Sequence, residues 1–145
     1  MRRALVIIGM ALSLVGCSSN EEPEAKTGLG ERNTATRQFT LPSKNIGCLV
    51  TAESARCDIG EKTWQPPAKP ADCQQAWGSA ITVTAEGATL TCAGDTVMGA
   101  AEILDYGKAV QVGDFVCNSA SAGVRCTHAP SGRGFTLARA EFKIF

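Results

Sequence analysis

The sequence predicts an all-β or strand-dominated domain: a small antiparallel sandwich or barrel, stapled by disulfides, with one short helix near residues 72–77. Three observations lead to this prediction. Six cysteines follow residue 47, short runs of alternating apolar and polar residues are separated by turns, and a single helix start signal stands out after the N-terminal region. Chains with many short strands of this kind form sandwiches or closed barrels.

Length and composition fit one globular domain. The chain has 145 residues, 44% of them apolar and 19% charged. Its 14 Lys and Arg equal its 14 Asp and Glu, so it lacks the basic excess of a nucleic-acid-binding protein. His128 is the one histidine of the sequence, which leaves little material for metal or general-base chemistry. We therefore expect no nucleic-acid partner, no cofactor, no metal site and no catalytic residue.

The N-terminus has the form of an export signal. Arg2 and Arg3 precede thirteen uncharged residues, 4–16. As a helix this stretch would span about 20 Å, against about 30 Å for the hydrocarbon core of a bilayer. It is short for a transmembrane anchor and has the usual length of a signal peptide. It ends in Leu14-Val15-Gly16-Cys17, which resembles the lipobox of bacterial lipoproteins.

The lipobox resemblance implies that residues 1–16 are cleaved off and that Cys17 carries a diacylglycerol thioether. The alternative is an ordinary secretory signal with a chance cysteine. Several acyl chains would anchor the protein stably, whereas a single chain binds membranes only marginally. Loss of Arg2 and Arg3 leaves 12 basic and 14 acidic residues, so the net charge of −2 gives no attraction to anionic lipids. We expect a lipid-anchored protein on the extracytoplasmic face of the cell membrane, with the membrane as a partner through Cys17.

Residues 17–38 are predicted to be a lipidated cysteine followed by a disordered polar tether. Leu29 is the one large apolar residue between Cys17 and Phe39, so the segment cannot bury enough surface to offset its ordering entropy. As a flexible coil its residues would span about 25 Å on average. The remaining residues, 39–145, form the predicted single domain.

Cysteine parity separates the anchor from the domain. An odd count is unusual in an exported protein, and it is resolved when one of the seven cysteines carries lipid. Six then remain to form three disulfides. They are Cys48, Cys57, Cys73, Cys92, Cys117 and Cys126. The alternatives are a zinc site or a redox couple, but the sequence has no C-x-x-C motif.

Spacing favours one of the fifteen possible connectivities. Cys48 and Cys57 are nine residues apart, as are Cys117 and Cys126, and similar residues surround both pairs. Each pair reads as a β-hairpin. With two-residue loops at 52–53 and 121–122, both pairs fall at non-hydrogen-bonded positions, where strands approach closely enough for a cross-strand bridge. A four-residue loop would shift both pairs to the wider site. The pair Cys73–Cys92 follows by elimination.

The rest of the domain reads as short strands. They begin at 39–41 and end at 142–145, and about nine are expected in all, including the runs 46–52 and 55–59 of the first hairpin. Asp72 is a candidate helix N-cap, Gln75 follows three positions later, and Gly78 is placed to end the helix. The two similar hairpins suggest an imperfect internal duplication, although two matches are too few to establish one.

The order of motifs from residue 39 onward resembles that of an uncharacterised family of exported actinobacterial proteins. The resemblance covers residues 39–145 and implies a secreted or lipid-anchored β-rich domain without a known activity. It rests on Phe39-x-x-Pro42-Ser43-x-Asn45-Ile46-Gly47-Cys48, Arg56-Cys57-Asp58-Ile59, Trp64, Pro70-x-Asp72-Cys73, Trp77-Gly78, Cys92-x-Gly94-Asp95-Thr96, Tyr106-Gly107, Gly123-Val124-x-Cys126 and Gly134-Phe135-x-Leu137-x-Arg139.

Charged candidates each have a structural explanation. Asp95 could be a catalytic carboxylate or metal ligand, but we expect it to cap a turn, as we do for the other aspartates beside turns: Asp58, Asp72, Asp105 and Asp114. Three arginines could form a patch for an anionic ligand: Arg56, Arg125 and Arg139. Arg56 and Arg125 each precede a bridged cysteine and should point away from it, so exposed cross-strand ion pairs are expected.

The aromatic and hydroxyl candidates are weighed in the same way. Trp64 and Trp77 flank Cys73 and could stack on a sugar, but packing over the disulfide is the more common role. His128 is expected to be a solvent-facing strand residue, because no nucleophile or zinc motif accompanies it. Residues 131–134 read as a flexible turn that lacks the lysine and the length of a phosphate-binding loop.

Two classes of function remain. The first is a non-enzymatic binding or structural module on the cell surface, whose partner is an unidentified envelope ligand or protein. The second is an envelope hydrolase that acts on polysaccharide or peptide through a pair of carboxylates. The absence of a catalytic motif favours the first. Redox activity, a third possibility, would require an exposed cysteine of low pKa.

Overall fold

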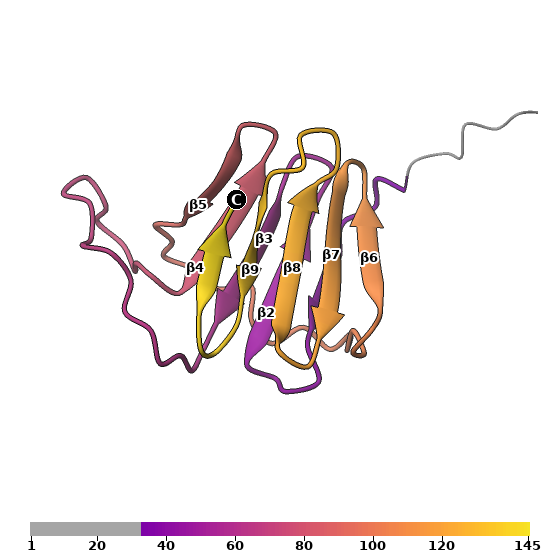
Figure 1. Ribbon diagram of the computed structural model, residues 1–145, viewed down its shortest axis with the longest axis horizontal. Coiled ribbons are helices and arrows are strands. Elements are labelled where there is room, and N and C mark those ends of the chain that lie inside the picture. The colour runs from indigo at the N-terminus through magenta and orange to yellow at the C-terminus, as the bar shows by residue number, and fades with distance from the viewer. Residues whose placement is uncertain (1–32) are drawn as a thin grey trace, which may run out of the picture.

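The structure, a computed structural model, describes residues 33–145, and the predicted signal peptide, Cys17 and most of the predicted tether lie outside the described residues. Two five-stranded antiparallel sheets are present, each a meander in chain order (Figure 1). The first contains β1 (Arg37–Thr40), β2 (Ile46–Val50), β3 (Ala55–Ile59), β4 (Ala80–Thr84) and β5 (Gly87–Leu90). The second contains β6 (Ala109–Val112), β7 (Phe115–Ala120), β8 (Gly123–His128), β9 (Gly134–Leu137) and β10 (Phe142–Ile144). The prediction of a strand-dominated sandwich is confirmed.

Both predicted cysteine hairpins form in the expected register. Cys48 pairs with Cys57 and Cys117 with Cys126, and each pair has a Cα–Cα distance of 4.1 Å. The loops have two residues, because Thr51 N donates to Ser54 O at 2.8 Å and the register places Ala120 opposite Gly123. The short Cα–Cα distance is that of a non-hydrogen-bonded pair. The third disulfide joins Cys73 to Cys92, as elimination predicted.

The two hairpin disulfides lie against each other in the middle of the core. Cys57 Sγ of the first sheet is 3.5 Å from Cys126 Sγ of the second, and all four sulfur-bearing residues have no exposed surface. Large apolar side chains that are fully or almost fully buried surround them: Phe39, Leu41, Val50, Ile81, Val83, Val112, Phe135 and Leu137. Each sheet therefore contributes the same unit, a five-stranded meander whose second and third strands carry a disulfide. This equivalence supports the internal duplication that the sequence suggests.

The predicted helix at residues 72–77 is wrong. Cys73 N donates to Pro70 O at 3.1 Å, which closes a turn, and Cys73 is tied to Cys92. Ala76 then forms an antiparallel bridge with Ala93, in which both backbone N–H groups donate across the pair. These tertiary bonds take the backbone groups that a helix would need for its own ladder. The described residues contain no helix, and therefore no helix in this part of the chain that is long and apolar enough to cross a membrane.

A strap, residues 93–101, crosses the outer face of the first sheet on its way to the second. Gln38 Nε2 donates to Val97 O at 3.1 Å and Thr40 Oγ1 donates to Ala100 O at 3.0 Å. Val97 of the strap is buried against the sheet. A Cβ at Gly47 would lie 2.8 Å from Val97 O, so the absence of a side chain at Gly47 allows the strap to approach. The strap thus covers the outer face of β1, β2 and β3.

The chain enters the described domain at one end of the sandwich, which we call the N-terminal end. Gly113 N, in the β6–β7 turn, donates to Asn33 O at 2.8 Å, and Gly113 packs against Ala52 of the β2–β3 turn. The turns β1–β2, β7–β8 and β9–β10 lie at the opposite end, which we call the far end (Figure 1). β1 begins at Arg37, two residues before the predicted start of the domain at Phe39. Any tether that precedes Asn33 therefore joins the domain away from the far end.

Candidate binding cleft

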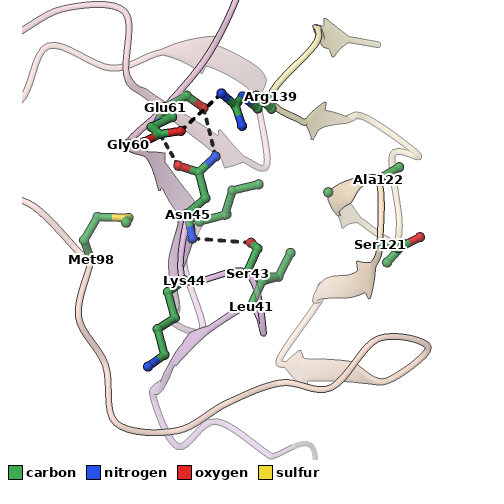
Figure 2. Close-up of a pocket in the computed structure, with 13 residues that line it drawn as sticks. Leu41, Ser43, Lys44, Asn45, Gly60, Glu61, Met98, Ser121, Ala122 and Arg139 are labelled. Carbon is green, nitrogen blue, oxygen red and sulfur yellow. Dashed lines mark hydrogen bonds and ion pairs between the residues drawn. The ribbon is translucent and has the colours of Figure 1, made fainter.

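A cleft of about 540 Å³ opens at the far end (Figure 2). It combines both halves of the sandwich, because its walls come from the β1–β2 turn, the start of the β3–β4 connection, the strap, the β7–β8 turn and the β9–β10 turn. Its polar and charged lining side chains are Ser43, Lys44, Asn45, Glu61, Ser121 and Arg139. A site shared by two equivalent meanders exists only when both sheets are packed together.

Asn45 fixes one wall of the cleft. Its Nδ2 donates to Glu61 O at 2.8 Å, and its Oδ1 accepts from Glu61 N at 2.6 Å. Gly60 N donates to Asn45 O at 2.9 Å. Asn45 thereby ties the β1–β2 turn to the end of β3. In Figure 2, its amide points at Glu61 while Lys44 extends in the opposite direction.

Lys44 occupies a left-handed backbone conformation with φ of 58°. It is the one non-glycine residue with positive φ within the described residues, and its N–H donates to Leu41 O at 2.8 Å to close the turn. A left-handed conformation costs an ordinary L-residue about 1–2 kcal/mol. Lys44 is exposed and forms no ion pair with another described residue. The turn therefore places an ammonium group without a described ion-pair partner at the cleft. Its backbone conformation is one that glycine adopts at lower energetic cost than lysine.

The second cation of the cleft is held loosely. Arg139 Nη2 lies 3.3 Å from Glu61 Oε2, and their side chains are 66% and 76% exposed. Such exposed ion pairs contribute little to stability, because water screens them. Arg139 can exchange Glu61 for another anion at small cost. With Lys44 and Arg139 against Glu61, the charged residues that line the cleft carry one excess positive charge.

A Lys44→Gly substitution should separate folding from binding at this turn. Glycine adopts positive φ without steric cost but gains more conformational freedom in the unfolded chain. We expect the free energy of unfolding to stay the same or to rise by up to about 1 kcal/mol, whereas ligand binding at the cleft should weaken. Urea denaturation measures the first effect. A clear loss of stability would show that the Lys44 side chain holds the turn.

Two predicted candidates, Asp58 and Asp95, hold the strap. Asp58 is 6% exposed and pairs with Arg56 Nε at 2.8 Å. Its Oδ2 also accepts from Thr96 Oγ1 at 2.9 Å and Val97 N at 3.1 Å. Arg56 donates further to Asp95 Oδ1 at 2.8 Å and Asp95 O at 2.9 Å. The predicted exposed cross-strand pair is wrong for Arg56, whose side chain is 15% exposed, because the strap covers it.

Acid should loosen the strap through Asp95. The hydrogen bond from Arg56, together with its charge, lowers the pKa of Asp95 below the usual value of 3.8. A carboxylate with a lowered pKa stabilises the fold above its unfolded pKa and loses that contribution as the pH falls through its folded pKa. Between about pH 4 and pH 2, wild type should lose more stability than Asp95→Asn. Urea midpoints measured across this range test this, and parallel curves for the two proteins would contradict it.

The remaining aspartates lie in or beside turns but do not meet one another at a cleft. Asp72 is exposed in the turn before Cys73, and Asp105 O accepts from Lys108 N at 3.1 Å. Asp114 lies in the β6–β7 turn. Among the described residues that line the far-end cleft, Glu61 is the one carboxylate. A hydrolase of the two-carboxylate kind needs a facing pair, so this cleft lacks the arrangement that would favour the second functional class.

Both tryptophans donate a hydrogen bond to a backbone carbonyl, and Trp64 packs in a place that differs from the predicted one. Trp64 packs against Phe142, with ring centroids 4.5 Å apart, and its Nε1 donates to Ala138 O at 2.9 Å. Trp77 Nε1 donates to Pro67 O at 2.9 Å, and its ring is half-buried. Trp64 therefore closes the edge of the core beside β10 instead of covering the Cys73–Cys92 disulfide.

The expected exposure of His128 is wrong. His128 is 9% exposed, its ring lies 5.1 Å from that of Phe115 and its Nδ1 is 2.8 Å from Ser131 Oγ. Strand parity explains this: His128 is two residues after Cys126 and so faces the same side of β8. Ser131 also accepts from Arg133 N at 3.3 Å. The predicted turn at 131–134 is thus tied to the end of β8.

In the second half, Arg125 differs from the expected exposed ion pair, whereas Arg139 forms one. Arg125 lies over the ring of Phe145, 4.0 Å from its centroid, and has no carboxylate partner among the described residues. Arg139 pairs with Glu61 across the far end. The structure therefore separates the predicted three-arginine patch: Arg56 lies beneath the strap, Arg125 on the opposite outer face and Arg139 at the cleft.

The described residues contain one cluster with metal-ligand spacing, and it is made of sulfur. Cys48, Cys57 and Cys126 have Sγ atoms within 4.8 Å of one another. All three are closed into disulfides, whereas a metal requires thiolates. In this oxidised form the cluster is part of the core and offers no metal ligands.

Comparison with known proteins gives a family but no activity. Residues 30–145 match a family of unknown function, DUF6636. The chain belongs to this family. The DUF6636 match covers the whole described domain and begins shortly before Asn33. No curated protein and no solved structure matches the chain.

Sequence reasoning missed the far-end cleft, although one signal for it was present. The run Pro42-Ser43-x-Asn45 lies between β1 and β2 of the DUF6636 domain, and it places a polar turn directly before a buried strand. Asparagine in a turn commonly bonds nearby backbone, and here Asn45 bonds Glu61, sixteen residues away. No local pattern indicates that Arg139 joins this group.

Proposed function

We propose that this DUF6636 protein is a lipoprotein of the extracytoplasmic face of the cell membrane, anchored through Cys17, and that its domain is a non-enzymatic module that binds an anionic envelope component. The resemblance of residues 39–145 to exported actinobacterial proteins and the lipobox at Leu14–Cys17 support the location. The location also accounts for an even number of cysteines in the domain, all of them paired.

The observation that carries the binding role is the placement of the cleft. Lys44 and Arg139 reach it from different halves of the sandwich, at the end opposite Asn33. A tether of residues 18–32 would attach at the N-terminal end, so the cleft would face away from the membrane. A ligand site on the side away from the membrane would be open to components of the envelope. The excess positive charge favours a ligand with a carboxylate or phosphate group.

A capture experiment tests the binding role. The mature chain with Cys17→Ser, exported by a secretory signal, is immobilised and exposed to detergent extracts of the cell envelope. Wild type should enrich one component, and Lys44→Gln/Arg139→Gln should enrich it at least about tenfold less. Lys69→Gln/Lys108→Gln removes the same charge from exposed positions outside the cleft and should behave as wild type. Equal enrichment by all three proteins, or by none, would contradict the proposal.

A fractionation experiment tests the anchor separately. The full chain should be recovered with membranes, cleaved after Gly16, and should incorporate labelled fatty acid. Cys17→Ala should remove the label and block cleavage behind Gly16. A Cys17→Ala chain that is cleaved and released like an ordinary secreted protein, together with an unlabelled wild type, would identify the alternative of a simple secretory signal.

A further inference from the structure

The outer faces of the two sheets differ although the sheets are built alike. The strap covers β1, β2 and β3 of the first sheet, and a hollow of about 450 Å³ lies over β4 and β5. Within the described residues, the second sheet has no such cover over β7, β8, β9 and β10, where a groove of about 520 Å³ is open. Small residues form much of its floor, among them Ala120, Ala122, Gly123 and Ala138. Polar and charged side chains also line it: Asn118, Arg125, Thr136, Glu141 and Lys143.

The two halves place an arginine at the same position. Arg56 stands directly before Cys57 and Arg125 directly before Cys126, so both point to the outer face of their sheet. Arg56 receives two acceptors from the strap, the Asp95 carboxylate and the Asp95 carbonyl. Arg125 receives neither and rests on Phe145, which is 40% exposed. The second half therefore lacks a segment equivalent to the strap, whose Asp95 binds Arg56 in the first half.

We infer that the groove on the second sheet binds an acidic peptide segment of a partner protein, with a carboxylate of that segment on Arg125. The strap shows which chemistry satisfies this arginine: a bend at Gly94-Asp95 offers the carboxylate and the backbone carbonyl of one aspartate to the same guanidinium group. Lys143 adds a second cation, since its contact with Glu141 at 3.2 Å joins two exposed side chains and exchanges readily. Phe145, which contacts the Arg125 guanidinium group, adds an exposed apolar surface beside the groove.

The inference does not rest on the proposed far-end ligand. The groove and the far-end cleft share the β7–β8 turn, but Arg125 and Lys143 line the groove and not the cleft, whereas Lys44 and Arg139 line the cleft and not the groove. Substitutions can therefore address each site by itself.

The test uses two synthetic nine-residue peptides and the oxidised mature chain with Cys17→Ser. One peptide has the sequence of the strap, residues 93–101, and the other replaces its aspartate with asparagine. We expect saturable binding of the acidic peptide below about 1 mM by isotope-edited NMR, with the largest shifts on β8, β9 and β10. Arg125→Gln and the asparagine peptide should each weaken binding about tenfold or more.

Two control variants should bind the peptide as wild type does. Arg133→Gln removes another exposed arginine, at the N-terminal end. Lys44→Gln/Arg139→Gln removes the cations of the far-end cleft. No saturation up to about 1 mM, equal binding by Arg125→Gln, or shifts confined to the far-end cleft would overturn the inference. Self-association of the chain through β8–β10 without peptide would assign the groove to a second copy and overturn it as well.

Discussion

The variant C48A/C57A/C117A/C126A should fail to fold at 37 °C, whereas C73A/C92A should remain folded. Each hairpin disulfide closes a loop of about ten residues and contributes about 2.7 kcal/mol by chain entropy. Loss of both removes about 5 kcal/mol, against a typical domain stability of about 5–15 kcal/mol. The four sulfurs also fill the centre of the core, so their removal leaves a cavity between the sheets.

Circular dichroism and urea denaturation distinguish the two variants. The Cys73–Cys92 bridge closes a longer loop, but Cys92 is exposed and the bridge lies outside the hydrophobic core. Its loss should lower the free energy of unfolding by about 3 kcal/mol and leave cooperative unfolding intact. A quadruple variant that unfolds cooperatively near the wild-type midpoint would show that the stacked disulfides are dispensable.

Gly123→Ala should cost more than about 4 kcal/mol, while Gly107→Ala should cost only about 1 kcal/mol. Both glycines have positive φ, at 152° and 82°. They differ in space: a Cβ at Gly123 would lie 2.2 Å from Leu137 O, whereas nothing lies within 4 Å of a Cβ at Gly107. The alanine at position 123 must push β8 away from β9, because the atom it meets belongs to the backbone.

Urea denaturation of both glycine variants isolates the effect of close strand approach from that of backbone conformation. Similar losses of stability in the two variants would show that positive φ alone accounts for the cost. Gly123 also lines both the far-end cleft and the groove on the second sheet, so its small size shapes these two surfaces as well as permitting the strand pairing.

Local patterns sufficed for the hairpins. The nine-residue spacing of Cys48–Cys57 and of Cys117–Cys126 allows a two-residue or a four-residue loop, and the close approach that a cross-strand bridge needs selects the two-residue loop and its register. The same parity places His128 inside, two residues beyond Cys126, and the absence of a catalytic motif led to the opposite expectation. Strand parity was the better guide to its burial.

Tertiary contacts decided the rest. The capping pattern at Asp72 and Gln75 predicts a helix, but Ala76 bonds to Ala93 and Cys73 to Cys92, and these partners are distant in sequence. Asp58 reads as a turn cap because nothing nearby indicates that the strap will bury it. The far-end cleft is likewise assembled from five segments that are separate in sequence, so neither Glu61 nor Arg139 carries a local signal of its place there.

The most direct test of this account is the intact mass of the native protein, taken from membranes and treated with a thiol-alkylating reagent before and after reduction. We predict a chain that starts at Cys17 and carries acyl groups, takes up no alkyl group before reduction and takes up six afterwards. A chain that still contains residues 1–16, or any alkylation before reduction, would contradict it.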